Sequence, residues 1–356
     1  GLVYARLLTS PMPSGRVRSI DASEALRMDG VLGILTADDL PSSSAPAEPV
    51  LASEDVTFVG QPILAVAAIS DEIADSAIGR IKVNYEYRPF VTDPLESLVE
   101  GGPNAYPDGN VLQQSNSLED ENATIRGGFG TIKWPAGEVA RFRNGQEPRN
   151  VGFADGWTYG DLDAAFAEST AIVEESFVVA GTPHHCMEPR SSMAYWQNGK
   201  CYFYASTQSQ SAVVEPLAEL LGIAPENLCM ISENTGGGFG SKGRSYPTMA
   251  ITGRFSQLLN RPVQLRITRE EEYYLGVGRP GMQGWVKTGV RADGTVAAVD
   301  LIIISDGGPT GRNSASSSAQ HISVVYTPTA MRLRNIPVLP TPHPEVHKED
   351  LDRMRC

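Results

Sequence analysis

The sequence predicts an α+β protein in which mixed sheets, hairpins and helices form more than one compact region. The near-continuous apolar run PILAVAAIS at 62–70 is typical of a strand buried on both faces. Apolar residues at helical spacing over 213–221 predict an amphipathic helix that ends at Gly222. An Asn-Gly pair at 198–199 and an Asp-Gly pair at 293–294 each lie between apolar segments, which predicts two tight hairpins.

Composition divides the chain into four segments. Residues 1–95 contain alternating short strand and helix patterns, including a helix that is capped by Ser70. Residues 96–158 are polar and rich in Gly, Pro and Asn, which predicts a linker or an insertion. Ordered patterns return over 159–310, and we expect 311–356 to be irregular.

The charge of the chain excludes some classes of partner. Its 356 residues include 29 Lys and Arg against 42 Asp and Glu, which gives a net charge of −13. Nucleic acids and anionic membranes are therefore not expected as partners, because phosphate binding depends on clustered Lys and Arg. No apolar run approaches the roughly 20 residues that a membrane span needs.

The four cysteines predict no metal or iron–sulfur site. Cys186, Cys201, Cys229 and Cys356 form no CxxC pair, and their spacing matches no zinc or iron–sulfur pattern. We therefore expect them to be small hydrophobic residues and a tail thiol. Any redox chemistry would need a cofactor that is held without cysteine clusters, or redox centres on another chain.

The stretch SENTGGGFGSKG at 232–243 has three interpretations: a nucleotide phosphate site, a pterin cofactor site, or a plain tight turn. Gly238, Gly240 and Gly243 satisfy GxGxxG between a predicted strand and a predicted helix. However, no alternation of strands and helices precedes this motif. The next strand also lacks the acidic residue that a dinucleotide site needs, since Glu270 lies 27 residues beyond Gly243.

The glycines themselves indicate close approach of a ligand to the main chain. Successive glycines adopt positive φ without steric cost, and their N–H groups can converge on an anionic or oxo ligand. Phe239 is the one large residue among them, and it could cover such a ligand. This pattern suits a bulky, electron-rich cofactor.

Four stretches carry a resemblance to a known family: LVYARLLTSPMPSGRVRSIDASEALRMDGVLGILTADDLP, FVGQPILAVAAISDEIADSAIGRIKVNYEYRPFVTDPLESL, HHCMEPRSSMAYWQNGKCYFYASTQSQS and TGGGFGSKG. Through them the chain resembles the large, molybdenum-binding subunit of the xanthine dehydrogenase, aldehyde oxidase and carbon monoxide dehydrogenase family of molybdenum hydroxylases. The first two are similar to its N-terminal α/β hammerhead domain, which the resemblance assigns to 1–95. The last two are similar to its first molybdopterin-binding domain, which the resemblance assigns in part to 159–310.

The resemblance implies five site residues. Gln208 matches a glutamine that hydrogen-bonds an oxygen on molybdenum in that family, so it is the implied catalytic and cofactor-binding residue. Gly237, Gly238, Phe239 and Gly240 match a loop that contacts the oxo ligand and the pterin through its main chain. No side chain of this chain is expected to bind the metal directly, because the pterin holds it. Amide and main-chain N–H donors suit oxygen acceptors of this kind.

The sequence departs from the family pattern in three places. Gly243 lies where purine-oxidising members carry a glutamate, which argues against purine substrates. GVGRPGMQ lies where many members have an Arg-His-Pro segment. The GxGE motif that supplies the family's catalytic base does not occur in the 356 residues. The resemblance therefore implies the N-terminal half of a large subunit, either split or truncated, with the base on a second chain or domain.

The implied function is that of a molybdenum-dependent oxidoreductase that hydroxylates an aldehyde or a heteroaromatic carbon with oxygen from water. The implied cofactor is molybdenum–molybdopterin, in the plain or the cytosine dinucleotide form, with iron–sulfur clusters and FAD on partner subunits. A cytoplasmic location is expected ahead of a periplasmic one. Two alternatives stay open: a non-catalytic hammerhead scaffold that binds partner chains, and a dinucleotide-binding oxidoreductase.

Two further patterns receive structural interpretations. His184, His185 and Glu188 form H-H-x-x-E, which is not the HExxH of a zinc protease, and we expect a loop that packs on the hairpin. The charge run REEEYY at 269–274, like Glu233, is expected to face solvent.

Overall fold

The computed structural model separates the chain into two compact units, each considered by itself below. Unit 1 comprises Gly1–Pro89 and Pro183–Gly278, and unit 2 comprises Phe90–Thr182 and the described residues from Arg279 onward. No helix among the described residues is long and apolar enough to cross a membrane. The structure describes residues 1–40, 50–104, 109–112, 129–308 and 315–339.

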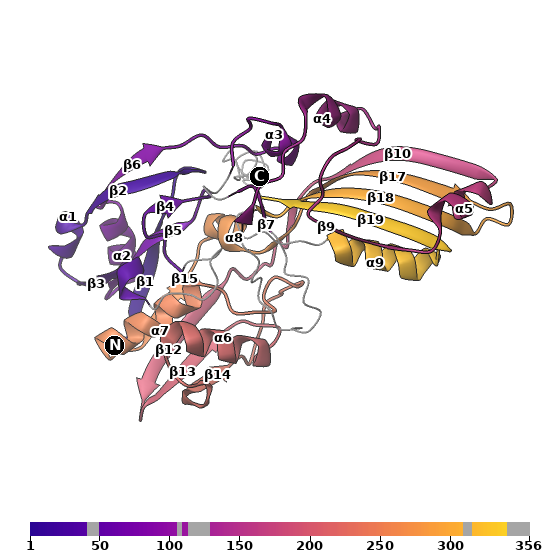
Figure 1. Cartoon of the computed structure of the whole chain (residues 1–356). Coiled ribbons are helices and arrows are strands. Elements are labelled where there is room, and N and C mark those ends of the chain that lie inside the picture. Colours follow the sequence, from indigo (N-terminus) through magenta and orange to yellow (C-terminus); the bar gives the residue numbers. More distant parts are fainter. Residues whose placement is uncertain (41–49, 105–108, 113–128, 309–314, 340–356) are drawn as a thin grey trace. The chain divides into compact units, whose positions relative to one another are not determined.

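Unit 1 is built around one mixed sheet whose strands come from both parts of its sequence. In spatial order the strands are β14 (Leu228–Ile231), β13 (Lys200–Ala205), β12 (Ser191–Gln197), β15 (Val263–Arg266), β1 (Val3–Thr9), β5 (Pro62–Ala68) and β3 (Val31–Leu35). Strand β1 pairs in parallel with β15 and antiparallel with β5 (Figure 1). Every residue of β5 is buried, which confirms the strand predicted from its apolar run.

Two helices of unit 1, α2 (Asp71–Ile78) and α6 (Ser211–Leu221), are capped where their sequences predict. The unit also contains α1 (Ser23–Leu26), α7 (Thr248–Leu259) and α8 (Arg269–Leu275), with 3₁₀ turns η1 (Ala37–Asp39) and η2 (Pro225–Asn227). Ser70 caps α2 by accepting a hydrogen bond from Ile73 N at 3.3 Å. Gly222 ends α6 with a φ of +66°, as expected of a glycine C-cap. A smaller sheet has the order β4 (Asp55–Val56), β2 (Gly15–Asp21), β6 (Lys82–Tyr87).

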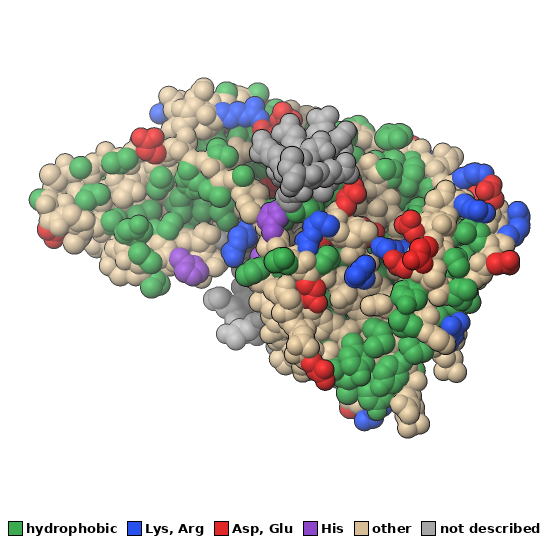
Figure 2. All heavy atoms as spheres, turned by 180° about the vertical axis from the view of Figure 1, so that it is seen from behind, with side chains coloured by type: hydrophobic (Ala, Val, Ile, Leu, Met, Phe, Trp, Pro, Cys, Tyr) green, Lys and Arg blue, Asp and Glu red, His purple; other side chains and the backbone are tan. Residues whose placement is uncertain are grey.

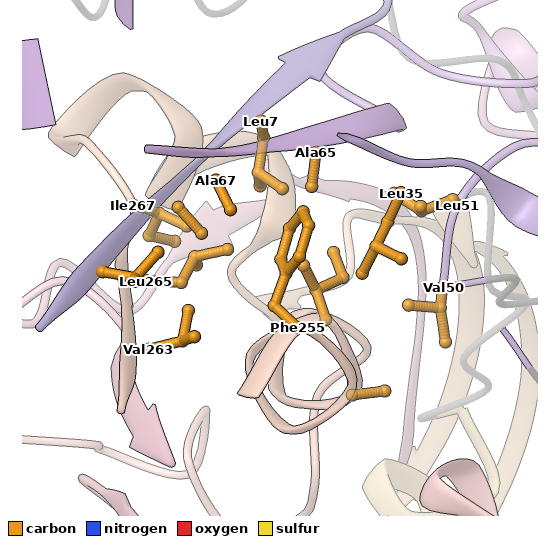
Figure 3. Close-up of a cluster of buried hydrophobic side chains, with 14 residues drawn as sticks. Leu7, Leu35, Val50, Leu51, Ala65, Ala67, Phe255, Val263, Leu265 and Ile267 are labelled. Atoms are coloured by element: carbon orange, nitrogen blue, oxygen red, sulfur yellow. The ribbon is translucent and has the colours of Figure 1, made fainter. Parts of the chain in front are cut away.

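The largest core cluster of unit 1 joins its N-terminal strands to helix α7. The ring of Phe255 on α7 points toward Leu7 of β1, and Leu35 of β3 and Val263 of β15 belong to the same cluster (Figure 3). Helices α6 and α7 cover one face of β12–β14 through a second cluster. On the other face Tyr195 stacks on Tyr202, and hydrophobic side chains gather on that side of unit 1 at the lower right of Figure 2.

Unit 2 is a second mixed sheet covered by short helices. In spatial order its strands are β10 (Ala171–Val179), β17 (Met282–Val290), β18 (Val296–Asp306), β19 (Ala330–Val338), β7 (Val111–Leu112) and β8 (Phe129–Gly130), and β9 (Asp155–Tyr159) also pairs with β19. Its helices are α3 (Pro94–Leu98), α4 (Ala136–Arg143), α5 (Leu162–Ala167) and α9 (Ala315–Tyr326).

The predicted hairpins are both present: β12 pairs with β13, and β17 pairs with β18. The chain passes from unit 1 to unit 2 after Pro89, returns within β11 (Thr182–Pro183) and leaves again within β16 (Gly278–Arg279).

Two segments are more ordered than their composition predicts. The described part of 96–158 is not merely a linker, because it contains α4 and β9, and Trp134 and Phe142 are buried in a core cluster. Within 311–356, helix α9 and strand β19 contradict the expected irregular structure, whereas 340–356 lies outside the described residues. The division of the chain at residues 95, 158 and 310 stays a prediction.

Strand β19 was hidden from sequence reasoning by two charged residues. Arg332 and Arg334 interrupt its apolar pattern. Both guanidiniums pair with the carboxylate of Asp300 on the neighbouring strand β18, for example Arg332 Nε to Asp300 Oδ1 at 3.0 Å. The partner that makes these arginines compatible with a sheet lies 32 residues from Arg332 and 34 from Arg334, so the local pattern cannot reveal it.

We expect replacement of Phe255 by alanine to destabilise unit 1 strongly. Phe255 is 2% exposed, and loss of a buried aromatic ring typically costs about 3–5 kcal/mol of unfolding free energy. Leu258→Ala is the matched control, because this leucine on the same helix is 54% exposed. Urea denaturation of both variants measures the difference, and equal effects would contradict the assigned core.

Candidate functional site

The glycine loop, defined here as residues 236–240, connects β14 to the segment that leads into α7. Its main chain is unusual, because Gly237, Phe239 and Gly240 have φ angles of +94°, +51° and +100°. Such angles suit glycine but are uncommon for phenylalanine. The side chain of Phe239 is 65% exposed and so does not pack in the core. The loop is therefore held in shape by other contacts.

Gln208 is in direct contact with this loop. Its Oε1 atom accepts hydrogen bonds from Gly240 N at 3.0 Å and Lys242 N at 3.1 Å. A Cβ atom at Gly238 would lie 2.3 Å from the same Oε1, so only glycine permits this approach. The carboxamide oxygen of this exposed residue is thus occupied by two N–H donors, and its NH₂ group donates to no acceptor among the residues that the structure describes.

The glycine loop presents further main-chain donors. Gly236 N donates to Glu188 and Gly240 N donates to Gln208. Within the described part of the chain, the N–H groups of Gly237, Gly238 and Phe239 donate to no protein acceptor. Three neighbouring N–H groups beside an amide NH₂ group are a donor set that fits a ligand rich in oxygen acceptors.

An ion pair between a buried lysine and a partly exposed glutamate contacts the glycine loop at Gly236 and just beyond Gly240. The ammonium group of Lys242, which is fully buried, donates to Glu188 Oε2 and to the Glu188 carbonyl, both at 2.9 Å. The same Oε2 accepts from Gly236 N at 2.7 Å. Burial acts to raise the pKa of Glu188, but the hydrogen bonds from Lys242 and Gly236 outweigh it, so that the pKa is lowered below 4.5. Glu188 is therefore charged at neutral pH.

An ion pair that is buried on both sides contacts the main chain directly after the glycine loop. Arg190 is 1% exposed, and its N–H donates to Glu272 Oε2 at 2.7 Å while its guanidinium pairs with the other carboxylate oxygen. The guanidinium also donates to the Ser241 carbonyl and lies 5.3 Å from the centre of the Tyr246 ring. The expectation that the run 269–274 faces solvent is therefore wrong for Glu272, and it is wrong also for the buried Tyr273. The partner of Glu272, Arg190, is 82 residues away in sequence, so the run alone could not indicate the pairing.

The H-H-x-x-E residues diverge to separate partners. His185 Nδ1 lies 3.1 Å from the Tyr273 hydroxyl, His184 Nδ1 contacts the Val277 carbonyl, and Glu188 is occupied by Lys242. Among the described residues, no group of three or more His, Cys, Asp or Glu side chains could hold a metal ion. A small pocket beside the two histidines is lined also by Pro183, Arg269, Glu272, Tyr273, Gly276 and Val277.

The described cysteines are unpaired thiols, as expected. Cys186 and Cys201 are buried, and burial raises the pKa of Cys201 to about 12. Cys186 also contacts the loop, because its Sγ lies 3.4 Å from the Gly238 carbonyl. Cys356 lies outside the described residues.

The sheet around the glycine loop does not fit a dinucleotide fold. Strand β14, which precedes the loop, pairs in parallel with β13, but β13 and β12 form an antiparallel hairpin. A dinucleotide site requires a doubly wound, mostly parallel sheet with the motif at its first turn. The dinucleotide interpretation of the GxGxxG match is therefore not supported.

Two family models match the chain. The model described as "Molybdopterin cofactor-binding domain" matches residues 143–344. The model described as "Aldehyde oxidase and xanthine dehydrogenase, a/b hammerhead domain" matches residues 1–89. Residues 90–142 of unit 2 lie outside both matches, and the glycine loop and Gln208 lie inside the first match.

Curated relatives match over nearly the whole chain. The chain is 27% identical to a probable xanthine dehydrogenase component of Bacillus subtilis (strain 168), over 95% of this chain and 41% of that protein. It is 26% identical to the nicotine 6-hydroxylase large subunit of Paenarthrobacter nicotinovorans, over 86% of this chain and 35% of that protein. The chain therefore spans well under half the length of these relatives.

Solved structures share the fold. The aldehyde oxidoreductase from Desulfovibrio gigas superposes with a TM-score of 0.72 at 20% identity, over 95% of this chain and 36% of that one. The quinoline 2-oxidoreductase from Pseudomonas putida 86 also gives a TM-score of 0.72, at 21% identity, over 96% of this chain and 42% of that one. At these identities the likeness establishes the architecture alone.

We expect Gly238→Ala to displace the Gln208 carboxamide and to lower the free energy of unfolding by about 1–3 kcal/mol, through overpacking and lost hydrogen bonds. Gly243→Ala is the matched control, since a Cβ there meets its nearest atom, the Gly240 carbonyl oxygen, at 3.7 Å. Urea denaturation of both variants provides the measurement. Equal stabilities would show that Gly238 tolerates a side chain.

The Glu188 carboxylate should make stability depend on pH. Its pKa is lowered in the folded chain, so its contribution is present above the ordinary value of 4.5 and is lost as the pH falls through the lower folded value. We expect Glu188→Gln to lose stability at pH 7 and to converge with the parent chain at acidic pH. Glu233→Gln, which removes an exposed carboxylate on the same connection, serves as the control. A difference that is constant with pH would contradict this role.

Proposed function

Because the chain belongs to the molybdenum hydroxylase large-subunit family of xanthine dehydrogenase and aldehyde oxidase, we propose that it forms the cofactor-binding part of such a subunit. The observation that carries the proposal is the contact between Gln208 and the glycine loop, in which the N–H groups of three residues donate to no acceptor in the described part of the chain. The residues present fit a molybdopterin cofactor, which is rich in such acceptors.

Each site residue has one proposed task. The NH₂ group of Gln208 donates a hydrogen bond to a cofactor oxygen, and its orientation is already fixed by Gly240 and Lys242. A donor that is fixed before the reaction costs no reorganisation when charge develops. The N–H groups of Gly237, Gly238 and Phe239 hold further oxygens, and the exposed Phe239 ring excludes water from them. When bound, the cofactor supplies the two-electron oxidation of a carbon centre with oxygen from water.

The complete reaction needs groups beyond those of the glycine loop. A carboxylate base must lie within hydrogen-bond reach of the group that it deprotonates, and no GxGE motif occurs in the 356 residues. We therefore place the base on a second chain or domain, and iron–sulfur clusters and FAD on partner subunits. The nicotine 6-hydroxylase relative is named as a large subunit, which supports a multi-subunit assembly.

The finer assignments follow from the same proposal. The substrate is an aldehyde or a heteroaromatic compound, and Gly243 argues against a purine. The cofactor takes either the plain or the cytosine dinucleotide form, and the assembly is cytoplasmic. The hammerhead domain corresponds to 1–95, and the partial molybdopterin-binding domain corresponds to 159–310.

Gln208→Ala, made in the complete subunit with its partners, tests the proposal. We expect the variant to keep its molybdenum and pterin and to lose about 10²–10³ in turnover, as for loss of one fixed donor. Gln210→Ala is the control, because Gln210 is an exposed residue of the same segment whose amide group donates to the Ser232 carbonyl. Elemental analysis, pterin fluorescence and steady-state rates are the measurements.

Two outcomes would contradict the proposal. Full activity of Gln208→Ala would remove this residue from the mechanism. Absence of molybdenum and pterin from the parent subunit would favour the non-catalytic scaffold instead.

A further inference from the structure

The Glu188–Lys242 ion pair spans the glycine loop from one end to the other. Glu188 Oε2 binds the main chain at Gly236, the first residue of the loop, and the ammonium group of Lys242, two residues beyond the last. The Lys242 ammonium also donates to the Glu188 carbonyl at 2.9 Å. One pair of side chains therefore fixes both ends of the loop against the same residue.

Lys242 also connects this pair to Gln208. Its main-chain N–H donates to Gln208 Oε1 at 3.1 Å, and its carbonyl accepts from Gln208 N and from Thr207 Oγ1, both at 2.9 Å. A shift of Lys242 would therefore move the donor that orients the Gln208 carboxamide. The proposed catalytic amide and the loop depend on the position of the same lysine.

The energetics favour a single geometry for this arrangement. The Lys242 side chain is 0% exposed, and a buried ammonium group without its carboxylate is strongly unfavourable. The positive φ of Phe239 is also unfavourable for a non-glycine residue, and such a conformation persists only where surrounding contacts determine it. The Phe239 side chain is largely exposed, so core packing does not supply those contacts.

We infer that Glu188 and Lys242 are positioning residues of the cofactor site. Their ion pair holds the glycine loop in the conformation in which the N–H groups of Gly237, Gly238 and Phe239 have no acceptor among the described residues, and it fixes the orientation of Gln208. The inference rests on the proposed function for the identity of the ligand, but the holding of the loop is a property of the chain without it.

Hydrogen exchange tests the holding of the loop in the chain without cofactor. The readout is the exchange of the hydrogen-bonded amides at residues 240–242, with β5 as the internal reference. Loss of a charged hydrogen-bond partner should speed exchange at 240–242 about tenfold or more in Glu188→Gln and in Lys242→Met. The double variant should show less than the sum of the two effects, because both residues act through one interaction.

Asp71→Asn is the matched control for this experiment. It removes the carboxylate of another ion pair of unit 1, between Asp71 and Arg6, outside the glycine loop. It should leave exchange at 240–242 unchanged. Faster exchange in β5 of Lys242→Met would mean that this variant opens globally. The inference is then judged on Glu188→Gln alone, which keeps an acceptor for Gly236.

The molybdenum and pterin content of the complete subunit tests the link to the cofactor. We expect the molybdenum and pterin content to fall at least tenfold in Glu188→Gln and in Lys242→Met, because each variant loses a charged hydrogen bond. The content of Asp71→Asn should not fall. Unchanged exchange at 240–242 would overturn the inference whether or not cofactor is bound. Faster exchange with full cofactor content would overturn the positioning role. Faster exchange in a protein whose parent form holds no cofactor would reject the proposed function and leave only the holding of the loop.

Discussion

The fully buried ammonium group of Lys242 is the interaction on which the candidate site depends. A cation in such a place must have a carboxylate and further acceptors, and Glu188 supplies both a carboxylate oxygen and a carbonyl oxygen. The same arrangement also fixes Gly236 and Gly240. The N–H of Gly236 donates to Glu188, and the N–H of Gly240 donates to Gln208. The loop can then leave neighbouring N–H groups free without losing its shape.

The site also depends on residues that are far away in the sequence. Helix α7, which follows the loop, buries Phe255 among side chains of β1 and β3 from the N-terminal region. Strand β1 pairs with β15 as well, so residues 1–89 and 183–278 share one sheet and one core. The region that matches the hammerhead model therefore contributes to the stability of the loop that matches the cofactor-binding model.

The sequence alone was sufficient to predict structural features that depend on a local pattern of residues. The apolar run of β5, the hairpin turns, the glycine end of α6 and the contact between Gln208 and the glycine loop all follow from adjacent residues or from a family motif. The sequence was insufficient where a charge is neutralised by a distant residue. Glu272 pairs with Arg190 over 82 positions, and Asp300 makes two arginines of β19 compatible with a sheet. Glu188 and Lys242 belong to the same class, and a lysine two residues after the glycine loop was the one available signal.

A crystal structure of the complete subunit with its native cofactor tests the central claim most directly. The account requires Gln208 Nε2, and at least one N–H group of Gly237, Gly238 or Phe239, to lie about 2.7–3.2 Å from oxygen atoms of the cofactor. The Lys242 ammonium should remain bonded to Glu188. A cofactor bound elsewhere in the subunit, with the glycine loop and Gln208 in contact only with solvent or protein, would contradict the account.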